Sequence, residues 1–206
     1  MNIKDFGGLE VEIRPYRSKD EIGWVRCRTL SFLDTAYFDH VLNKKETYQN
    51  PAIELVAIEN EQIVGLLDIE YEKTEKSICT KGEGLGGMIW HIAVHPDYRR
   101  RAIGTRLLKT AEKIAEEIGL NYLEAWTRDD RWVNEWYVKS GFDKVYSYLQ
   151  VFMAGDKEIN KAIKVNDPQL KVIQAFAHYS GEDKEEGVKS NFERVHECNC
   201  YEKNLI

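Results

Sequence analysis

Residues 88–105 carry the strongest structural signal in the chain and read Met88-Ile89-Trp90-His91-Ile92-Ala93-Val94-His95-Pro96-Asp97-Tyr98-Arg99-Arg100-Arg101-Ala102-Ile103-Gly104-Thr105. The first seven are an almost unbroken apolar run, which is typical of a strand buried on both faces. From Ile103 to Ile118 the apolar residues keep one helical stripe, and Gly119 follows where a left-handed cap belongs. The stretch predicts a buried strand, a short loop and a long helix.

The junction between this strand and this helix is suited to an anion. The first N–H groups of a helix have no partner within it, and the helix dipole adds partial positive charge there. A pyrophosphate is the anion that such a junction favours most. Ala102 and Gly104 are small enough for a ligand to approach the backbone, provided that Ala102 keeps a negative φ. The run Arg99 to Arg101 adds charge, although an exposed basic turn explains that run equally well.

Upstream of this stretch, the pattern indicates a hairpin and one or two helices. The runs Ile53 to Ile58 and Ile63 to Tyr71 are strand-like and close together, so we expect them to pair antiparallel. Leu9 to Tyr16 alternates as a first strand. A helix follows, opened by a capping box in which Glu21 reaches back to Ser18. Phe38 to Tyr48 is expected to form a second helix, ended before Pro51.

Downstream, the chain continues as a mixture of strands and helices. Three elements are expected, namely a strand at Tyr122 to Trp126, a helix from about Asp130 to Gly141, and a strand at Val145 to Met153. The charged segment Asp156 to Pro168 precedes two more strand-like runs, Leu170 to Tyr179 and Arg194 to Tyr201. We therefore predict an α/β fold (α+β, mixed sheet) with a domain at 1–155 and a C-terminal extension at 156–206, packed on that domain or completing it.

Composition excludes several classes of protein. The 206 residues are 43% hydrophobic and 31% charged, which is unlike a disordered chain. A net charge of −6 gives no overall basic field for nucleic acid. No window reaches the eighteen apolar residues of a membrane span, and the start lacks the apolar region of a secretory signal. We expect a cytoplasmic protein with reduced cysteines and no membrane partner.

Two motifs make the chain resemble the GCN5-related N-acetyltransferases (the GNAT family). The first, Arg99-Arg100-Arg101-Ala102-Ile103-Gly104, directly follows a buried strand, with Ala102 where the family has glycine. The second is Trp136-Tyr137-Val138-Lys139-Ser140-Gly141-Phe142. The order of elements is similar as well. The resemblance extends from Val11 to Met153 and implies a splayed mixed sheet flanked by helices, with extra C-terminal strands.

The resemblance implies direct transfer of an acetyl group from acetyl-CoA to a primary amine. Tyr137 would act as general acid, although a packing tyrosine is the competing interpretation. Where the family often has an Asn, this chain offers Asp129 and Asp130. The residues expected to bind the cofactor are Ile92, Ala93 and Val94, through backbone groups that meet the pantetheine, and Arg99, Arg100, Arg101, Ala102, Ile103, Gly104 and Thr105, around the diphosphate.

A general base is not evident from the sequence. The positions assigned to the face that would meet the substrate are Met88, Trp90 and Ile92, and none accepts a proton. His91 has the opposite parity and is interpreted as a core histidine, unless a bulge re-aims it. Asp68 and Glu70 share one strand face, for which a solvated polar surface is the simpler interpretation.

Other readings stay open at this point. A non-catalytic acyl-CoA-binding or sensing module would need no base, and a local RNA contact through the arginines would be steeply salt-dependent. The acceptor could be a small molecule or a peptide, and the extension could cover the cleft or form a homodimer edge. Gly82-x-Gly84-x-x-Gly87 lacks the strand–helix context of a dinucleotide site. His196-x-Cys198-x-Cys200 has strand spacing that is awkward for zinc, so no metal is expected.

Overall fold

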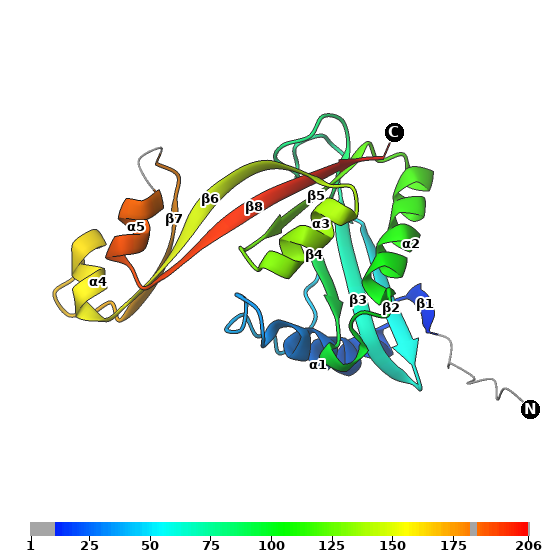
Figure 1. Cartoon of the computed structure of the whole chain (residues 1–206), viewed down its shortest axis with the longest axis horizontal. Helices are drawn as coiled ribbons and strands as arrows, with labels where there is room; N and C mark the ends of the chain where they lie inside the picture. The colour runs from blue at the N-terminus through cyan, green and yellow to red at the C-terminus, as the bar shows by residue number, and fades with distance from the viewer. Residues whose placement is uncertain (1–10, 182–184, 206) are drawn as a thin grey trace, which may run out of the picture.

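The computed structural model describes residues 11–181 and 185–205, and within them a mixed sheet is flanked by helices (Figure 1). This confirms the predicted fold class. The sheet has eight strands in the order β1-β2-β3-β4-β5-β8-β6-β7. Their bounds are β1 (Glu12–Pro15), β2 (Ala52–Glu59), β3 (Gln62–Tyr71), β4 (Gly86–Val94), β5 (Tyr122–Thr127), β6 (Asp143–Ala154), β7 (Gln174–Tyr179) and β8 (Arg194–Asn204).

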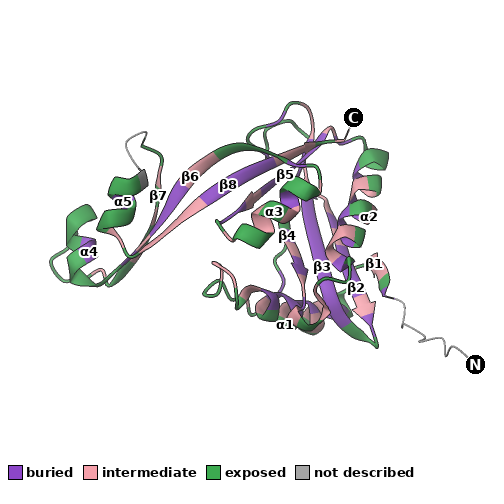
Figure 2. Cartoon of the chain, viewed as in Figure 1, coloured by how far each residue is buried: buried purple, intermediate pink, exposed green. Residues whose placement is uncertain are grey.

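Helices cover both faces of the sheet. They are α1 (Glu21–Phe32), α2 (Ile103–Ile118), α3 (Arg131–Lys139), α4 (Gly155–Ala162) and α5 (Glu185–Asn191), with short 3-10 turns η1 (Ser18–Asp20) and η2 (Pro96–Tyr98). Leu55 and Leu67 point to the main core under α2 and α3, whereas Val56 and Leu66 meet Trp24 of α1. Because neighbouring strand residues alternate between these clusters, α1 lies on the opposite face from α2. Figure 2 shows the most continuous burial along β3 and the neighbouring central strands.

Strand β8 completes the centre of the sheet although it comes last in the chain. It pairs antiparallel with both β5 and β6, while β4 and β5 pair parallel. Beyond the body, β6, β7 and β8 run on as a long arm that carries α4 and α5 (Figure 1). These two helices and one face of the arm share a small core that includes Val151, Ile159 and Val188. The boundary between residues 155 and 156 stays a prediction.

The helix expected at Phe38 to Tyr48 is wrong. This segment is irregular, and Phe38 and Val41 are exposed. No backbone bond to a carbonyl four residues back is seen in it. Phe38 and His40 bond carbonyls three residues back, and the N–H of Lys45 bonds Glu21. Directly after the segment, Glu70 accepts the N–H groups of Gln49 and Asn50. Tertiary contacts therefore replace the helical hydrogen bonds.

The expected capping box is also placed differently. The carboxylate that reaches back is that of Asp20, which accepts the N–H of Arg17 at 2.8 Å and pairs with Arg14. This bond to Arg14 holds the pKa of Asp20 below its usual range, although burial opposes it. The first strand is Glu12–Pro15, shorter than the expected Leu9 to Tyr16, of which Leu9 and Glu10 lie outside the described residues.

Candidate active site

The sheet opens between β4 and β5. Their parallel pairing covers only Gly86–Ile89 against Tyr122–Ala125. From Trp90 to Val94, β4 has no strand partner on its β5 side within the described part of the chain, while the end of β5 pairs with β8. Among the three residues predicted here, the backbone groups of Ile92 and Val94 point to this open edge, although the Val94 carbonyl accepts a bond from Arg99 Nε. The backbone of Ala93 pairs with Leu66 of β3, so the contact predicted for it was wrong. This is the splayed sheet that the resemblance implied.

A β-bulge at Trp90 changes which side chains face outward from the core. His91 pairs with Asp68, but Ile89 pairs with Ile69, so Trp90 is an extra residue on β4. Its indole donates to Glu70, and the His91 ring meets Trp24 of α1 edge-on. Both side chains thus lie on the α1 face, because a bulge shifts the alternation by one residue. The parity predicted for His91 and Ile92 was wrong, and Ile92 packs toward the main core.

The loop after β4 presents a row of free backbone donors at the start of α2. Every N–H from Arg100 to Thr105 lacks an acceptor within the described chain, and the first helical bond is Arg106 N–H to the Ala102 carbonyl. Arg100 and Ala102 adopt positive φ values of 61° and 57°. The condition stated for Ala102, a negative φ, is therefore not met. Left-handed backbone at these two positions turns successive N–H groups outward, as in an anion-binding nest.

The arginine side chains of this loop are mostly neutralised by the protein itself. Arg99 pairs with Asp34, and Arg101 binds Glu59 through both carboxylate oxygens. Arg100 is exposed and has no partner in the described residues. The positive potential of the loop thus comes chiefly from its main chain, from the helix dipole and from Arg100.

Gly104 of the first sequence motif lies close to Trp136 of the second. A Cβ on Gly104 would lie 3.6 Å from Val94 and 3.8 Å from Trp136, which is ordinary van der Waals contact. Its φ is not positive, so neither space nor backbone conformation requires glycine there. The open surface over Gly104 is consistent with the close approach of a ligand.

Tyr137 lies in the main core beside this opening and is 4% exposed. Its ring stacks on Tyr201 at 5.3 Å and meets Trp136 and Phe142 edge-on. Burial raises the pKa of the phenol well above its usual value. Its hydroxyl has no hydrogen-bond partner in the part of the chain that the structure describes, so it is free to donate to a ligand.

The carboxylates of β3 are not solvated, and the interpretation of a polar surface was wrong. Asp68 is fully buried and bonds to Lys45 and Tyr48. Glu70 is nearly buried and accepts bonds from Asn50 and Trp90. The irregular segment between α1 and β2 covers both groups.

His91 is held between an arginine and a carboxylate. Arg28 of α1, itself buried, donates from Nε to His91 Nδ1 at 3.3 Å. Because arginine only donates, Nδ1 carries no proton, and the Nε2–H of the neutral ring donates to Glu46. This bond holds the pKa of Glu46 below its usual range, although burial opposes it. The Glu46 side chain is 43% exposed, so it can meet an incoming molecule.

Sequence reasoning missed Arg28, Lys45, Glu46 and Tyr48. Three of them lie in the stretch expected to be a helix. The signal against that helix was the run Asn43-Lys44-Lys45-Glu46, which interrupts the apolar periodicity with four polar residues.

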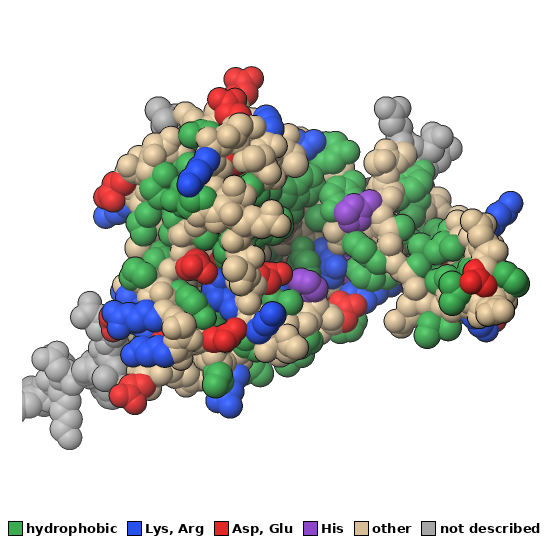
Figure 3. Space-filling model, turned by 180° about the vertical axis from the view of Figure 1, so that it is seen from behind, with side chains coloured by type: hydrophobic (Ala, Val, Ile, Leu, Met, Phe, Trp, Pro, Cys, Tyr) green, Lys and Arg blue, Asp and Glu red, His purple; other side chains and the backbone are tan. Residues whose placement is uncertain are grey.

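The arm adds an aromatic surface beside this region. Phe152 packs on Phe176, Tyr148 on His178, and the Arg194 guanidinium lies 4.0 Å from the centre of the Phe152 ring. These side chains lie on the face of the arm opposite α4 and α5. Seen from behind, the recess between arm and body holds hydrophobic, basic and histidine side chains (Figure 3).

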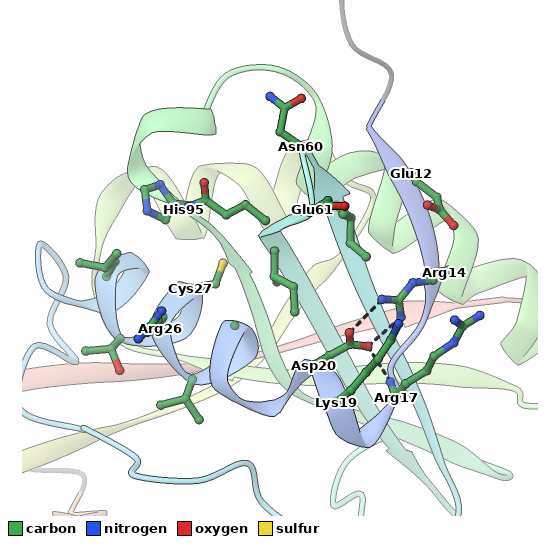
Figure 4. A pocket seen from close by; sticks show the side chains of 17 residues that line it. Glu12, Arg14, Arg17, Lys19, Asp20, Arg26, Cys27, Asn60, Glu61 and His95 are labelled. Atoms are coloured by element: carbon green, nitrogen blue, oxygen red, sulfur yellow. Dashed lines mark hydrogen bonds and ion pairs between the residues drawn. The ribbon is translucent and has the colours of Figure 1, made fainter.

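The larger of two hollows lies away from these groups. It encloses about 1040 Å³ beside α1 and the β2–β3 turn, and it includes none of the predicted site residues. Figure 4 shows its charged lining, with Asp20 bonded to Arg14 and to the Arg17 backbone. The smaller hollow, about 520 Å³, lies between α3 and the strands β6 and β8. Neither is assigned a ligand.

No group of three or more His, Cys, Asp or Glu side chains among the described residues is arranged to hold a metal ion. No helix within residues 11–181 and 185–205 has the length and apolar character needed to cross a membrane. Cytoplasmic location stays a prediction.

The sequence model of the acetyltransferase (GNAT) family matches residues 20–142. A search of curated proteins finds no match.

Solved structures share the fold at low sequence identity. A GNAT acetyltransferase from Elizabethkingia anophelis with acetyl-CoA bound has a TM-score of 0.53 at 15% identity, covering 94% of this chain and 97% of that one. Arabidopsis thaliana NAA60 with a bisubstrate analogue gives 0.56 at 14% identity, with 95% and 98% covered. The PaiA N-acetyltransferase of Thermoplasma acidophilum in complex with coenzyme A gives 0.51 at 16% identity, with 66% and 91% covered.

Proposed function

The chain belongs to the acetyltransferase (GNAT) family, and on this premise we propose that it transfers the acetyl group of acetyl-CoA to a primary amine. Transfer proceeds by direct attack of the amine on the thioester. The acceptor is a small molecule or a peptide.

The row of free N–H groups from Arg100 to Thr105 is the observation that carries this proposal. It lies at a helix N-terminus, directly after the open edge of β4, as a diphosphate followed by a pantetheine arm requires. Because the side chains of Arg99 and Arg101 are already paired with carboxylates, we assign most of the diphosphate binding to the main chain. The open-edge backbone at Ile92 and Val94 then orients the thioester, and an N–H there stabilises the oxyanion.

Tyr137 is the hydrogen-bond donor to the leaving sulfur of coenzyme A. Its raised pKa keeps the phenol protonated at every working pH, so it always offers a donor. Because that pKa exceeds the value of about 8.5 for a thiol, Tyr137 acts mainly by hydrogen bonding to the thiolate as it forms. The stack on Tyr201 fixes the ring in place.

Glu46 is our candidate for the proton acceptor. It is a carboxylate at neutral pH, half-exposed and bonded to His91 on the bulged strand. His91 itself has no free nitrogen lone pair, because Nδ1 accepts from Arg28 and Nε2 carries the proton shared with Glu46. His91 and Arg28 therefore position Glu46.

The C-terminal arm supplies a surface for a second copy of the chain. Strand β7 is at the edge of the sheet, and Gln174–Tyr179 contains neither a charged residue nor a proline, the usual protections of an edge strand. We therefore keep a homodimer as part of the proposal, tested by sedimentation of the wild type and of Ala177→Lys. A monomeric wild type contradicts it.

The activity is tested by the release of free thiol from acetyl-CoA in the presence of primary amines, from alkylamines to peptides. Release that depends on an amine, with acetylated product identified by mass spectrometry, is the expected result. Saturable coenzyme A binding without turnover on any amine would make the protein a binding module instead.

A further inference from the structure

The ammonium group of Lys45 lies in a cage of three aromatic rings. Its Nζ is 5.1 Å from the ring centre of Tyr16, 5.2 Å from that of Trp24 and 4.7 Å from that of Tyr48. Each distance is within the range of a cation–π contact. These rings come from the start of the chain, from α1 and from the irregular segment, so the tertiary fold assembles them around one cation.

Two carboxylates complete the cage. Asp68 lies 2.8 Å from Lys45 Nζ, and Glu54 accepts a further bond from it. The Lys45 side chain is only 4% exposed. Burial disfavours its charged form, but the two carboxylates outweigh burial and hold the pKa of Lys45 above its usual value.

Lys45 does not satisfy every hydrogen-bond acceptor of the cage. Asp68 is fully buried, yet its Oδ1 has no hydrogen-bond partner among the described residues. An ammonium group has three N–H donors, and a buried carboxylate oxygen without a donor is costly. The unused oxygen indicates a site for an ammonium group that is not confined to the geometry of Lys45.

Lys45, the occupant of the cage, belongs to a segment that no helix or strand holds in place. Lys45 belongs to the irregular segment, whose neighbouring residues Asn43, Lys44 and Glu46 are exposed. Its backbone is held by a side-chain bond to Glu21 rather than by a helix or strand. The cage also adjoins the reaction region, because Asp68 pairs with His91 across the sheet.

We propose that the cage of Tyr16, Trp24, Tyr48 and Asp68 is a binding site for the ammonium end of a linear alkylamine, with Lys45 as an internal occupant that such a ligand displaces. That this alkylamine is the acceptor of the acetyl group rests on the proposed function. The existence of the site does not, since its tests use neither coenzyme A nor turnover.

Chemical rescue of Lys45→Ala tests the site. Alanine keeps Cβ, so n-propylammonium supplies the missing Cγ, Cδ, Cε and Nζ. We expect a lower melting temperature for the variant and a saturable recovery of most of that loss with n-propylammonium. The neutral isostere 1-propanol should not restore it. Equal effects of the two compounds, or no effect of either, would overturn the proposal.

Lys203→Ala is the matched control. Lys203 also pairs with a glutamate, Glu112, and lies near one ring, that of Phe142, but it has no cage. Its variant should show no recovery specific to n-propylammonium, and a recovery equal to that of Lys45→Ala would contradict a site built by the cage.

A second measurement on the wild type covers the case in which Lys45→Ala does not fold. Three surrounding rings should shift the Lys45 ε-methylene protons upfield in a spectrum of lysine-labelled protein. Titration with n-propylammonium should move this signal to the position of an exposed lysine such as Lys139. A signal that stays in place throughout the titration shows that Lys45 is a fixed structural lysine and refutes displacement.

Discussion

The two sides of the opening in the sheet are built from different parts of the chain. On the proposed cofactor side, the loop from Arg100 to Thr105 offers main-chain N–H groups, and the side chains of Arg99 and Arg101 pair with carboxylates of the protein. On the proposed acceptor side, Asp68, Lys45 and His91 form a buried polar cluster under the exposed Glu46. The first side depends on local backbone geometry, and the second depends on contacts between distant segments.

Tyr137, where the two sides meet, should give the largest effect. Tyr137→Phe keeps the ring stack and removes only the donor, so we expect kcat to fall about 10²-fold, the lower range for a positioned proton donor. Coenzyme A affinity should be unchanged, because the diphosphate is bound elsewhere. Steady-state kinetics and calorimetry measure the two quantities.

Tyr201→Phe is the matched control for Tyr137. Tyr201 stacks on the same ring but bonds to Asn134, so its variant should lose about 1 kcal/mol of folding stability and little turnover. Equal turnover of Tyr137→Phe and the wild type would remove Tyr137 from the mechanism.

Gly104→Ala isolates the cofactor side. The protein has room for the methyl group, and alanine favours helix over glycine by at most about 1 kcal/mol, so folding stability should stay equal or rise. Coenzyme A affinity should fall about tenfold, or 1.4 kcal/mol, because the methyl group occupies the ligand's approach. Thermal melts measure the change in folding stability, and titration calorimetry measures the change in coenzyme A affinity. A loss of stability together with affinity would indicate a structural role for Gly104.

Glu46→Gln isolates the acceptor side through its pH dependence. Because the pKa of Glu46 is lowered, its carboxylate is already charged at neutral pH. The rise of activity with pH therefore reflects deprotonation of the amine substrate. We expect kcat/KM to fall about tenfold at pH 7, since Glu46 is half-exposed and water partly replaces it. The deficit should shrink as pH approaches the amine pKa of about 10.4, where no base is needed.

Glu135→Gln controls for the loss of a carboxylate at similar exposure, 45% against 43% for Glu46, and should leave the pH profile unchanged. A Glu46→Gln deficit that is constant with pH would assign Glu46 to binding rather than to proton transfer.

Ala102→Gly should have the smallest effect. A left-handed alanine costs about 1–2 kcal/mol, and the added freedom of glycine in the unfolded chain offsets about 0.4–1 kcal/mol of that. Folding stability should therefore stay equal or rise by up to about 1.6 kcal/mol in a denaturant titration, with coenzyme A affinity kept or improved. A fall in stability would contradict strain at Ala102.

The same difference between the two sides decides what the sequence could predict. The strand β4, the helix α2 and the motif between them are local, and the free donors follow from helix geometry alone. The hairpin β2–β3 and the position of α3 are local as well. By contrast, the placement of β8 between β5 and β6 requires a long-range pairing that no local pattern specifies.

The residues on the proposed acceptor side could not be predicted, because their positions depend on a bulge and on contacts between distant segments. The bulge at Trp90 re-aims His91, and one inserted residue reverses a parity argument that is otherwise sound. Residues 38–48 were predicted to be helical, but Lys45 bonds Glu21 and the following Gln49 bonds Glu70, both from elsewhere in the fold. Lys45 and Glu46 become interpretable only once these contacts are known.

Amide spectra of the wild type titrated with coenzyme A show whether the backbone donors of Arg100 to Thr105 bind the diphosphate. We expect downfield shifts and slowed hydrogen exchange at these amides. Pantetheine, which lacks the diphosphate, should leave the same amides unchanged. Saturable coenzyme A binding with these amides unperturbed would mean that the diphosphate binds elsewhere.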